Sequence, residues 1–219
     1  MQKRKIILGG YDSAEDGFWT LCSWKLSDPV HDQNFVKIPG SSVTLDLSTA
    51  LTDDEPTYQA RTLTATFESS EGDRLARKAR IDAMINQLDG FRMEIVLPDD
   101  PDRYLNGRVS VREKYNDLAH ASVSIEATCD PWKYSDTEII VALTATSTKQ
   151  TKTLTNAGRK SVVPAIEVTG SVNLIFEEQT WALSAGSYAL PGIYLTPGSH
   201  QLTYSGSGTI TLSYREAIL

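Results

Sequence analysis

The chain has 219 residues, of which 40% are apolar and 22% are charged, a balance typical of folded globular proteins rather than disordered or collagen-like ones. Its formal charge is −7, with 21 basic and 28 acidic side chains, which disfavours a protein that binds nucleic acid through a basic surface. No apolar run approaches the roughly 18 residues of a membrane-spanning helix, and the apolar run 6–8 behind the basic start is too short for a signal sequence. We therefore expect synthesis and folding in a cytoplasm, without membrane insertion.

In chain order, the stretch from Asp46 to Pro56, which includes Asp53, Asp54 and Glu55, predicts a polar loop. Beyond it, period-two alternation predicts three strands of a sheet with one buried face. The apolar positions of these strands are Leu63, Ala65 and Phe67, then Phe91, Met93, Ile95 and Leu97, and finally Val123, Ile125 and Ala127.

Residues 71–89 predict the one helix. They contain no proline and no glycine after Gly72, and their apolar residues follow the i, i+3, i+4, i+7 spacing of one helical face. These residues are Ile81, Met84, Ile85 and Leu88. Gly90 is expected to end the helix as a C-terminal cap, and the helix should lie across a sheet or its edge.

A turn is predicted at Leu97–Asp102, where two prolines and three aspartates cluster, and another strand is expected to begin at Arg103. The composition then changes near Asp130–Tyr134. Residues 1–133 hold 16 basic and 22 acidic side chains, whereas residues 134–219 hold 5 and 6. We expect a boundary there between an N-terminal domain (1–133) and a C-terminal domain (134–219).

The second half predicts a β-sandwich built from short strands and glycine-containing turns. The expected strands are Pro164–Thr169, Val172–Phe176, Gln179–Leu183, Gln201–Tyr204 and Thr209–Tyr214. Ser205–Gly208 is predicted to connect the last two as a hairpin turn.

No standard spacing for a nucleophile with its base, a metal cluster or a phosphate-binding loop occurs. His31, His120 and His200 are far apart in the sequence and are interpreted as polar loop or sheet residues, although a site assembled only by the fold stays open. Cys22 and Cys129 lie 107 positions apart without metal-ligand spacing, which indicates reduced thiols. We predict no catalytic residue, no cofactor and no enzyme activity.

Two clusters invite a ligand interpretation. Asp99, Asp100 and Asp102 offer oxygen atoms, but they lack the glycine and terminal glutamate of a calcium loop, so a solvated turn is favoured and no metal is assigned. The second half contains four aromatic residues, Trp181, Tyr188, Tyr194 and Tyr204, that suggest a sugar-binding face. Packing of these side chains in the core is the favoured alternative. Trp132 and Tyr134, at the boundary, are interpreted as packing between the two domains.

The segments Tyr104–Val109 and His120–Tyr134, together with Pro164–Gly170, Gly206–Leu212 and the closing Tyr214–Leu219, resemble the distal tail protein (Dit) family of phages with long, non-contractile tails. The helix precedes the first of these segments, as it does in that family. Ala217 stands where the closing motif commonly has glycine. The resemblance begins at about Thr57 and is weakest in the first 56 residues.

The resemblance implies a mainly β chain: an N-terminal β-sandwich-like ring domain with one helix, and a C-terminal galectin-like β-sandwich. It implies a structural hub in which six N-terminal domains form a homo-hexameric ring. The implied partners are the tail tube protein, a tail-associated lysin or tip protein, and a receptor-binding protein, at the virion tail tip after assembly in the host bacterial cytoplasm.

We further hypothesise that acidic side chains line the ring's channel, so that DNA passes without binding. A monomeric carbohydrate-binding module that recognises host cell-wall saccharide is the alternative function, and an enzyme ranks third.

Overall fold

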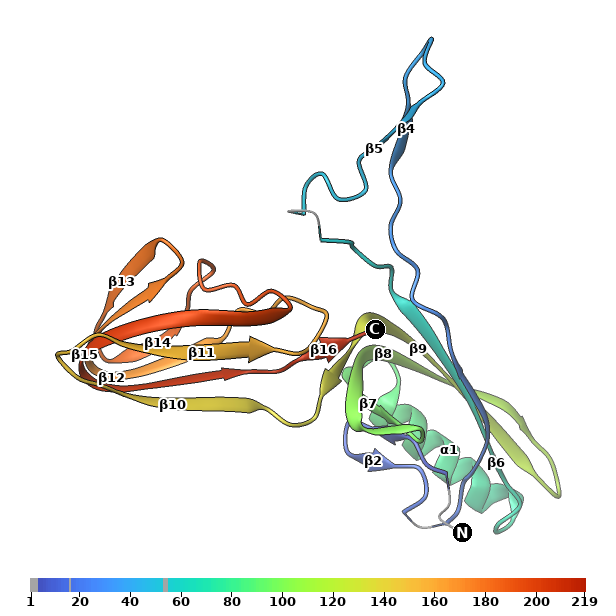
Figure 1. Cartoon of the computed structure of the whole chain (residues 1–219). Helices are drawn as coiled ribbons and strands as arrows, with labels where there is room; N and C mark the ends of the chain where they lie inside the picture. The colour runs from blue at the N-terminus through green and yellow to red at the C-terminus, as the bar shows by residue number, and fades with distance from the viewer. Residues whose placement is uncertain (1–3, 16, 53–54) are drawn as a thin grey trace. The chain divides into compact units, whose positions relative to one another are not determined.

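The computed structural model describes residues 4–15, 17–52 and 55–219 (Figure 1). Among these residues the chain is mainly β, with sixteen strands and one helix. It divides into two compact units, Met1–Pro131 and Trp132–Leu219, and the boundary expected after residue 133 lies two residues beyond this division. No helix in the described part of the chain is long and apolar enough to cross a membrane.

The first unit contains a sheet with the strand order β2-β1-β7-β8-β9-β6-β3, so that β2 and β3 form its two edges. The strands are β1 (Ile7–Leu8), β2 (Tyr11–Asp12), β3 (Thr20–Leu26), β6 (Arg61–Ser69), β7 (Arg92–Leu97), β8 (Asp100–Asn116) and β9 (Ala121–Ser135).

Strands β6 and β9 confirm the alternation predicted for the first and last of the three strands. Their predicted apolar positions are all buried, while Thr62 and Thr64, on either side of Leu63, are exposed. The register places Leu63 opposite Ala127 and Phe67 opposite Val123. Directly opposed residues share one face of a sheet, so the two strands present one continuous apolar surface to the core.

The predicted helix is α1 (Arg74–Leu88). It begins three residues later than the prediction because the Asp73 side chain caps it, accepting a hydrogen bond from the amide of Ala76 at 2.8 Å. Gly90 follows the helix with φ +80°, the conformation expected of a C-terminal cap glycine. Of the four apolar positions, Ile81, Met84 and Leu88 are buried and Ile85 is partly buried.

Two expectations around β7 were wrong. Phe91 is 58% exposed and precedes the strand, because the chain is still turning out of the helix cap when it reaches this residue. The turn predicted over six residues contains only Pro98 and Asp99. Strand β8 already starts at Asp100, which pairs with Leu97, whereas the preceding residue Val96 pairs with Tyr104. The register therefore shifts between Val96 and Leu97, and residues 101–103 of β8 lie at this irregularity.

Residues 28–60 leave the sheet between β3 and β6 and form a hairpin, here called the arm (Figure 1). The arm contains β4 (Phe35–Lys37) and β5 (Thr44–Asp46), which pair with each other and with no other strand of the described chain. Of the loop predicted from Asp46 to Pro56, Asp46 instead ends β5 and residues 48–52 form turns, while Asp53 and Asp54 lie outside the described residues.

The second unit is built around two long strands that pair over twelve residues, β12 (Ala165–Phe176) and β15 (Gly198–Tyr214). The other strands flank different halves of this pair, so that two layers enclose an apolar core. They are β10 (Ile139–Ala145), β11 (Gln150–Asn156), β13 (Gln179–Leu183) and β14 (Gly186–Ala189), and β16 (Ala217–Ile218) pairs with the last residues of β9.

The hairpin predicted at Ser205–Gly208 was wrong, because these residues lie inside β15. Gly206 and Gly208 have φ of +131° and +143°, values that only glycine adopts readily. They bend the strand opposite Gly170 of β12, where φ is +86°. Each pair of predicted short strands is therefore one continuous strand that bends between layers. Strand β13 has the predicted bounds.

Candidate interaction surfaces

The three histidines make their contacts in separate places. His31 lies in the arm and bonds with the side chain of Gln33 at 2.7 Å, and His200 in the second unit contacts the carbonyl of Thr196 at 2.8 Å. His120 follows the turn after β8 and lines a pocket with Cys22 and Glu68. The fold therefore places one histidine and one cysteine in the wall of the same pocket, a grouping that sequence spacing did not show.

The chemistry of the two thiols is that of unreactive cysteines. Desolvation, followed by the carboxylate of Glu68, raises the pKa of Cys22. Burial likewise raises the pKa of Cys129 to about 11, and this residue is 1% exposed. A nucleophilic cysteine needs the opposite shift, toward the thiolate, so both thiols stay protonated at neutral pH.

The aspartates of the β7–β8 connection do not converge on a common point. Asp100 accepts a hydrogen bond from Arg103 at 3.1 Å, while Asp99 lines a pocket described below. Within residues 4–15, 17–52 and 55–219, no group of three acidic, histidine or cysteine side chains has a metal-binding arrangement.

The aromatic residues of the second unit are held in different ways. Tyr204 is only 9% exposed and belongs to the core, and Trp181 packs against that core. The Tyr188 hydroxyl donates to the carbonyl of Ser184 at 2.9 Å, whereas Tyr194 is 40% exposed. At the start of the unit, Lys160 donates to the Tyr134 hydroxyl at 3.0 Å, and Trp132 lies in the same unit.

The arm is the most unusual surface of the described chain. None of its described residues is buried, although it carries many large apolar side chains. Those that are at least 43% exposed are Val30, Phe35, Val36, Ile38, Val43, Leu45 and Leu51. Singly exposed apolar residues are ordinary, but a contiguous group marks an interaction site.

The strand register gathers some of these side chains on one side of the arm. Val36 pairs with Leu45, so both point to the same face, and Ile38 and Val43 continue the alternation toward the tip. These four residues form the apolar face of the arm. The opposite face is mixed, because it carries Lys37 with its partner Thr44 and also Phe35 with its partner Asp46.

The root of the arm is tied firmly to the sheet. Ser27 and Thr62 exchange two hydrogen bonds of 2.9 Å, and the Arg61 side chain donates to the carbonyl of Ser27 at 2.8 Å. An isolated two-stranded hairpin is only marginally stable in water. The arm is thus anchored at its base and lacks a packed layer along its length.

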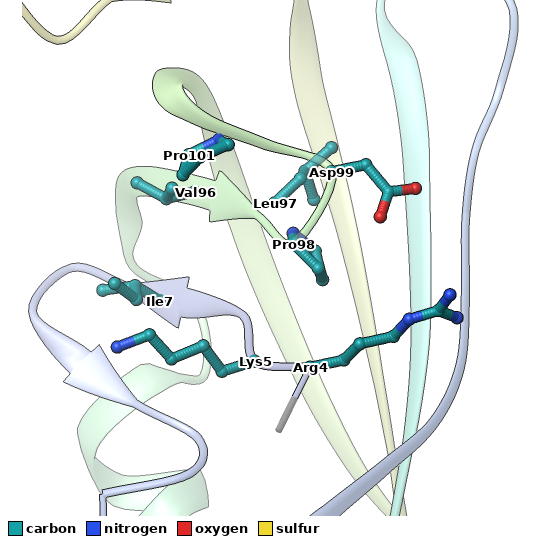
Figure 2. A pocket seen from close by; sticks show the side chains of 8 residues that line it. All are labelled: Arg4, Lys5, Ile7, Val96, Leu97, Pro98, Asp99 and Pro101. Atoms are coloured by element: carbon teal, nitrogen blue, oxygen red, sulfur yellow. The ribbon is translucent and has the colours of Figure 1, made fainter. Parts of the chain in front are cut away.

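A pocket of about 330 Å³ lies toward the other edge of the sheet, between β1 and the β7–β8 turn (Figure 2). Its apolar wall consists of Ile7, Val96, Leu97, Pro98 and Pro101. Ile7 and Val96 are opposed across the two strands, and Arg4 and Lys5 reach out to either side at the rim (Figure 2). Asp99 is the one acidic residue among the described lining residues.

No protein-family model and no curated protein sequence matches the chain. Among solved structures, however, both units together have the fold of a phage tail protein. That structure is SPP1 Dit (gp 19.1), described as a paradigm of the hub adsorption apparatus in phages that infect Gram-positive bacteria. The TM-score is 0.71 and the sequence identity 15%, over 98% of this chain and 99% of SPP1 Dit. The resemblance to the Dit family is therefore confirmed at the level of the fold.

Proposed function

We propose that this protein is a structural hub of a phage tail tip, forming a hexameric ring that joins the tail tube to the tip and to receptor-binding proteins. The single observation that carries the proposal is the extent of the fold match, which covers 98% of one chain and 99% of the other. A match to one widespread domain says little about function, because such folds host many activities. A match of two successive units from end to end is much more specific.

The exposed arm supports the ring. Residues 1–133 supply the ring-forming domain in this proposal, and residues 134–219 form a galectin-like sandwich on its outside. A closed ring of identical subunits in head-to-tail contact needs two different complementary surfaces on each copy. An anchored hairpin whose apolar face lacks cover provides one of them.

The proposed partners are the tail tube protein, a tail-associated lysin or tip protein, and a receptor-binding protein. The protein is assembled in the cytoplasm of the host bacterium and acts at the virion tail tip. Its role is structural rather than enzymatic, which is supported by the raised pKa values of Cys22 and Cys129.

DNA passes through the ring without specific binding in this proposal. Six copies of a chain with charge −7 carry −42, and acidic side chains at the lumen repel the phosphates over about one Debye length, near 8 Å at physiological salt. An image of the assembled ring with charges assigned tests this point. A lumen dominated by arginine and lysine contradicts it.

The ring is tested by measuring the mass of the purified protein by light scattering, alone and with its tube partner, and by negative-stain microscopy. Six chains of 24.1 kDa give a particle of about 145 kDa with a central hole. A monomer under both conditions contradicts the hub, and a monomer that also binds cell-wall saccharide supports the carbohydrate-binding alternative.

A further inference from the structure

The arm and the pocket of Figure 2 lie toward opposite edges of the sheet in the first unit. The arm emerges from β3, which is one edge strand, while the pocket is built on β1 and β7 near the other edge. A head-to-tail ring needs two different surfaces on each copy, one that contacts the preceding subunit and one that contacts the next. The arm and the pocket are two such surfaces, placed toward opposite edges of one sheet.

Reach does not limit this contact. Each side of the arm has about 16 residues, and an extended chain of that length spans at most roughly 50 Å. Seven strands at about 4.8 Å spacing make a sheet only about 30 Å wide. The arm is long enough to cross from its own edge strand to the nearer strands of an adjacent copy.

The two surfaces are also complementary in chemistry. The arm's face of Val36, Ile38, Val43 and Leu45 is apolar. The pocket offers a wall of five apolar residues. At its rim, Lys5 is already paired with Asp12 of its own chain at 2.5 Å, so the match between the two surfaces is one of apolar surface with apolar surface.

The pocket is preorganised to receive apolar side chains. Its volume lies in the range of ordinary ligand pockets, and Pro98 and Pro101 restrict the backbone of its wall. A rigid receiving surface binds more tightly because less conformational freedom is lost on docking.

We infer that the apolar face of the arm docks into this pocket on the next copy of the chain, so that each ring contact is an arm-in-pocket contact. This inference rests on the proposed ring and names the surfaces that close it.

The test is a disulfide cross-link between two versions of the full chain. Both carry Cys22→Ser to remove the exposed thiol. One version has Val36→Cys in the arm, and the other has Val96→Cys in the pocket and a tag that changes its mass. After mixing under ring-forming conditions and mild oxidation, we expect a covalent dimer containing one copy of each version. The matched control is Ile140→Cys, which is 63% exposed on β10 and should give several-fold less mixed dimer.

A second measurement separates the inference from the ring itself. Leu45→Asp places a charge on the apolar face of the arm and should shift the assembly from ring to monomer, whereas Thr44→Asp, on the other face, should leave the ring intact. Rings that tolerate both changes and give no mixed dimer above the control overturn the arm-in-pocket contact but leave the hub standing. A parent chain that never forms rings, alone or with its tube partner, overturns both.

Discussion

At the scale of single residues, Arg77 links helix α1 to the turn that joins β8 to β9. It is only 1% exposed, and its guanidinium donates hydrogen bonds to the carbonyls of Gly72 at 2.6 Å, Asp117 at 2.9 Å and Leu118 at 3.1 Å. A buried cation is tolerated only when its donors are satisfied. Here main-chain carbonyls satisfy them.

Replacing Arg77 by methionine should lower the free energy of unfolding by about 2–3 kcal/mol, because three main-chain carbonyls lose a charged hydrogen-bond donor. Urea unfolding measures the change. Arg112→Met on the exposed part of β8 is the control and should cost less than about 0.5 kcal/mol. Equal stability of the two variants would show that the hydrogen bonds of Arg77 contribute nothing net.

The carboxylate of Asp117 caps the same turn and links it to pH. The amides of His120 and Ala119 donate to it at 2.7 and 2.8 Å, and these two bonds lower its pKa. A carboxyl with a lowered folded pKa stabilises the protein above its unfolded pKa, about 3.9, and this stabilisation is lost as the pH falls through the folded value.

The prediction for Asp117 is that its carboxyl carbon titrates in the folded protein with a midpoint below that measured in urea. Carbon NMR follows both midpoints, and Asp117→Asn identifies the resonance by removing it. A folded midpoint at or above the unfolded one contradicts the capping role.

At the scale of elements, the bend shared by β12 and β15 decides how the second unit forms two layers. A Cβ atom at Gly208 would collide with the carbonyl oxygen of Thr169 on the paired strand. Gly198, at the start of β15, also has positive φ, +126°, but a Cβ atom there meets nothing within 4 Å. Substitutions at these two glycines therefore distinguish the cost of backbone strain alone from the added cost of a steric collision.

Gly198→Ala should cost about 1–3 kcal/mol through backbone strain alone. Gly208→Ala should cost clearly more, because the paired strands must also move apart. Thermal unfolding of the two variants, measured in parallel, gives the comparison. Similar losses would mean that the bend accommodates a methyl group.

At the scale of the whole molecule, the two units have separate hydrophobic cores. The first is formed around Phe67 and the second around Phe176, and the two core clusters share no residue among those described. Units with separate cores open as separate cooperative units.

Truncating Phe67 to alanine should speed amide hydrogen exchange in the first unit and leave the second unchanged, while Phe176→Ala should do the reverse. Each change removes about 3–5 kcal/mol from its own core. Exchange measured by mass spectrometry resolves the two units. Loss of protection spread evenly over both would indicate one cooperative core.

Much of the local structure was determined by the sequence itself. The helix with its cap at Gly90, and strands β6, β9 and β13, followed from side-chain periodicity and turn residues. These signals arise between residues close in the chain, so a short window contains the whole cause. Arg77 did not follow this pattern, because it occupies the apolar stripe four residues before Ile81 and two of its acceptors, Asp117 and Leu118, lie about 40 residues away in the chain.

Only the tertiary structure decided what the glycines, Phe91 and the arm do. Gly206 and Gly208 have the composition of a turn, yet pairing with β12 keeps them inside one strand. The apolar residues of the arm, including Val36 and Leu45, look like those of a buried hairpin, yet no other strand of the described chain lies against them. Whether an apolar residue is covered depends on segments distant in sequence or on another molecule, and no local pattern contains that information.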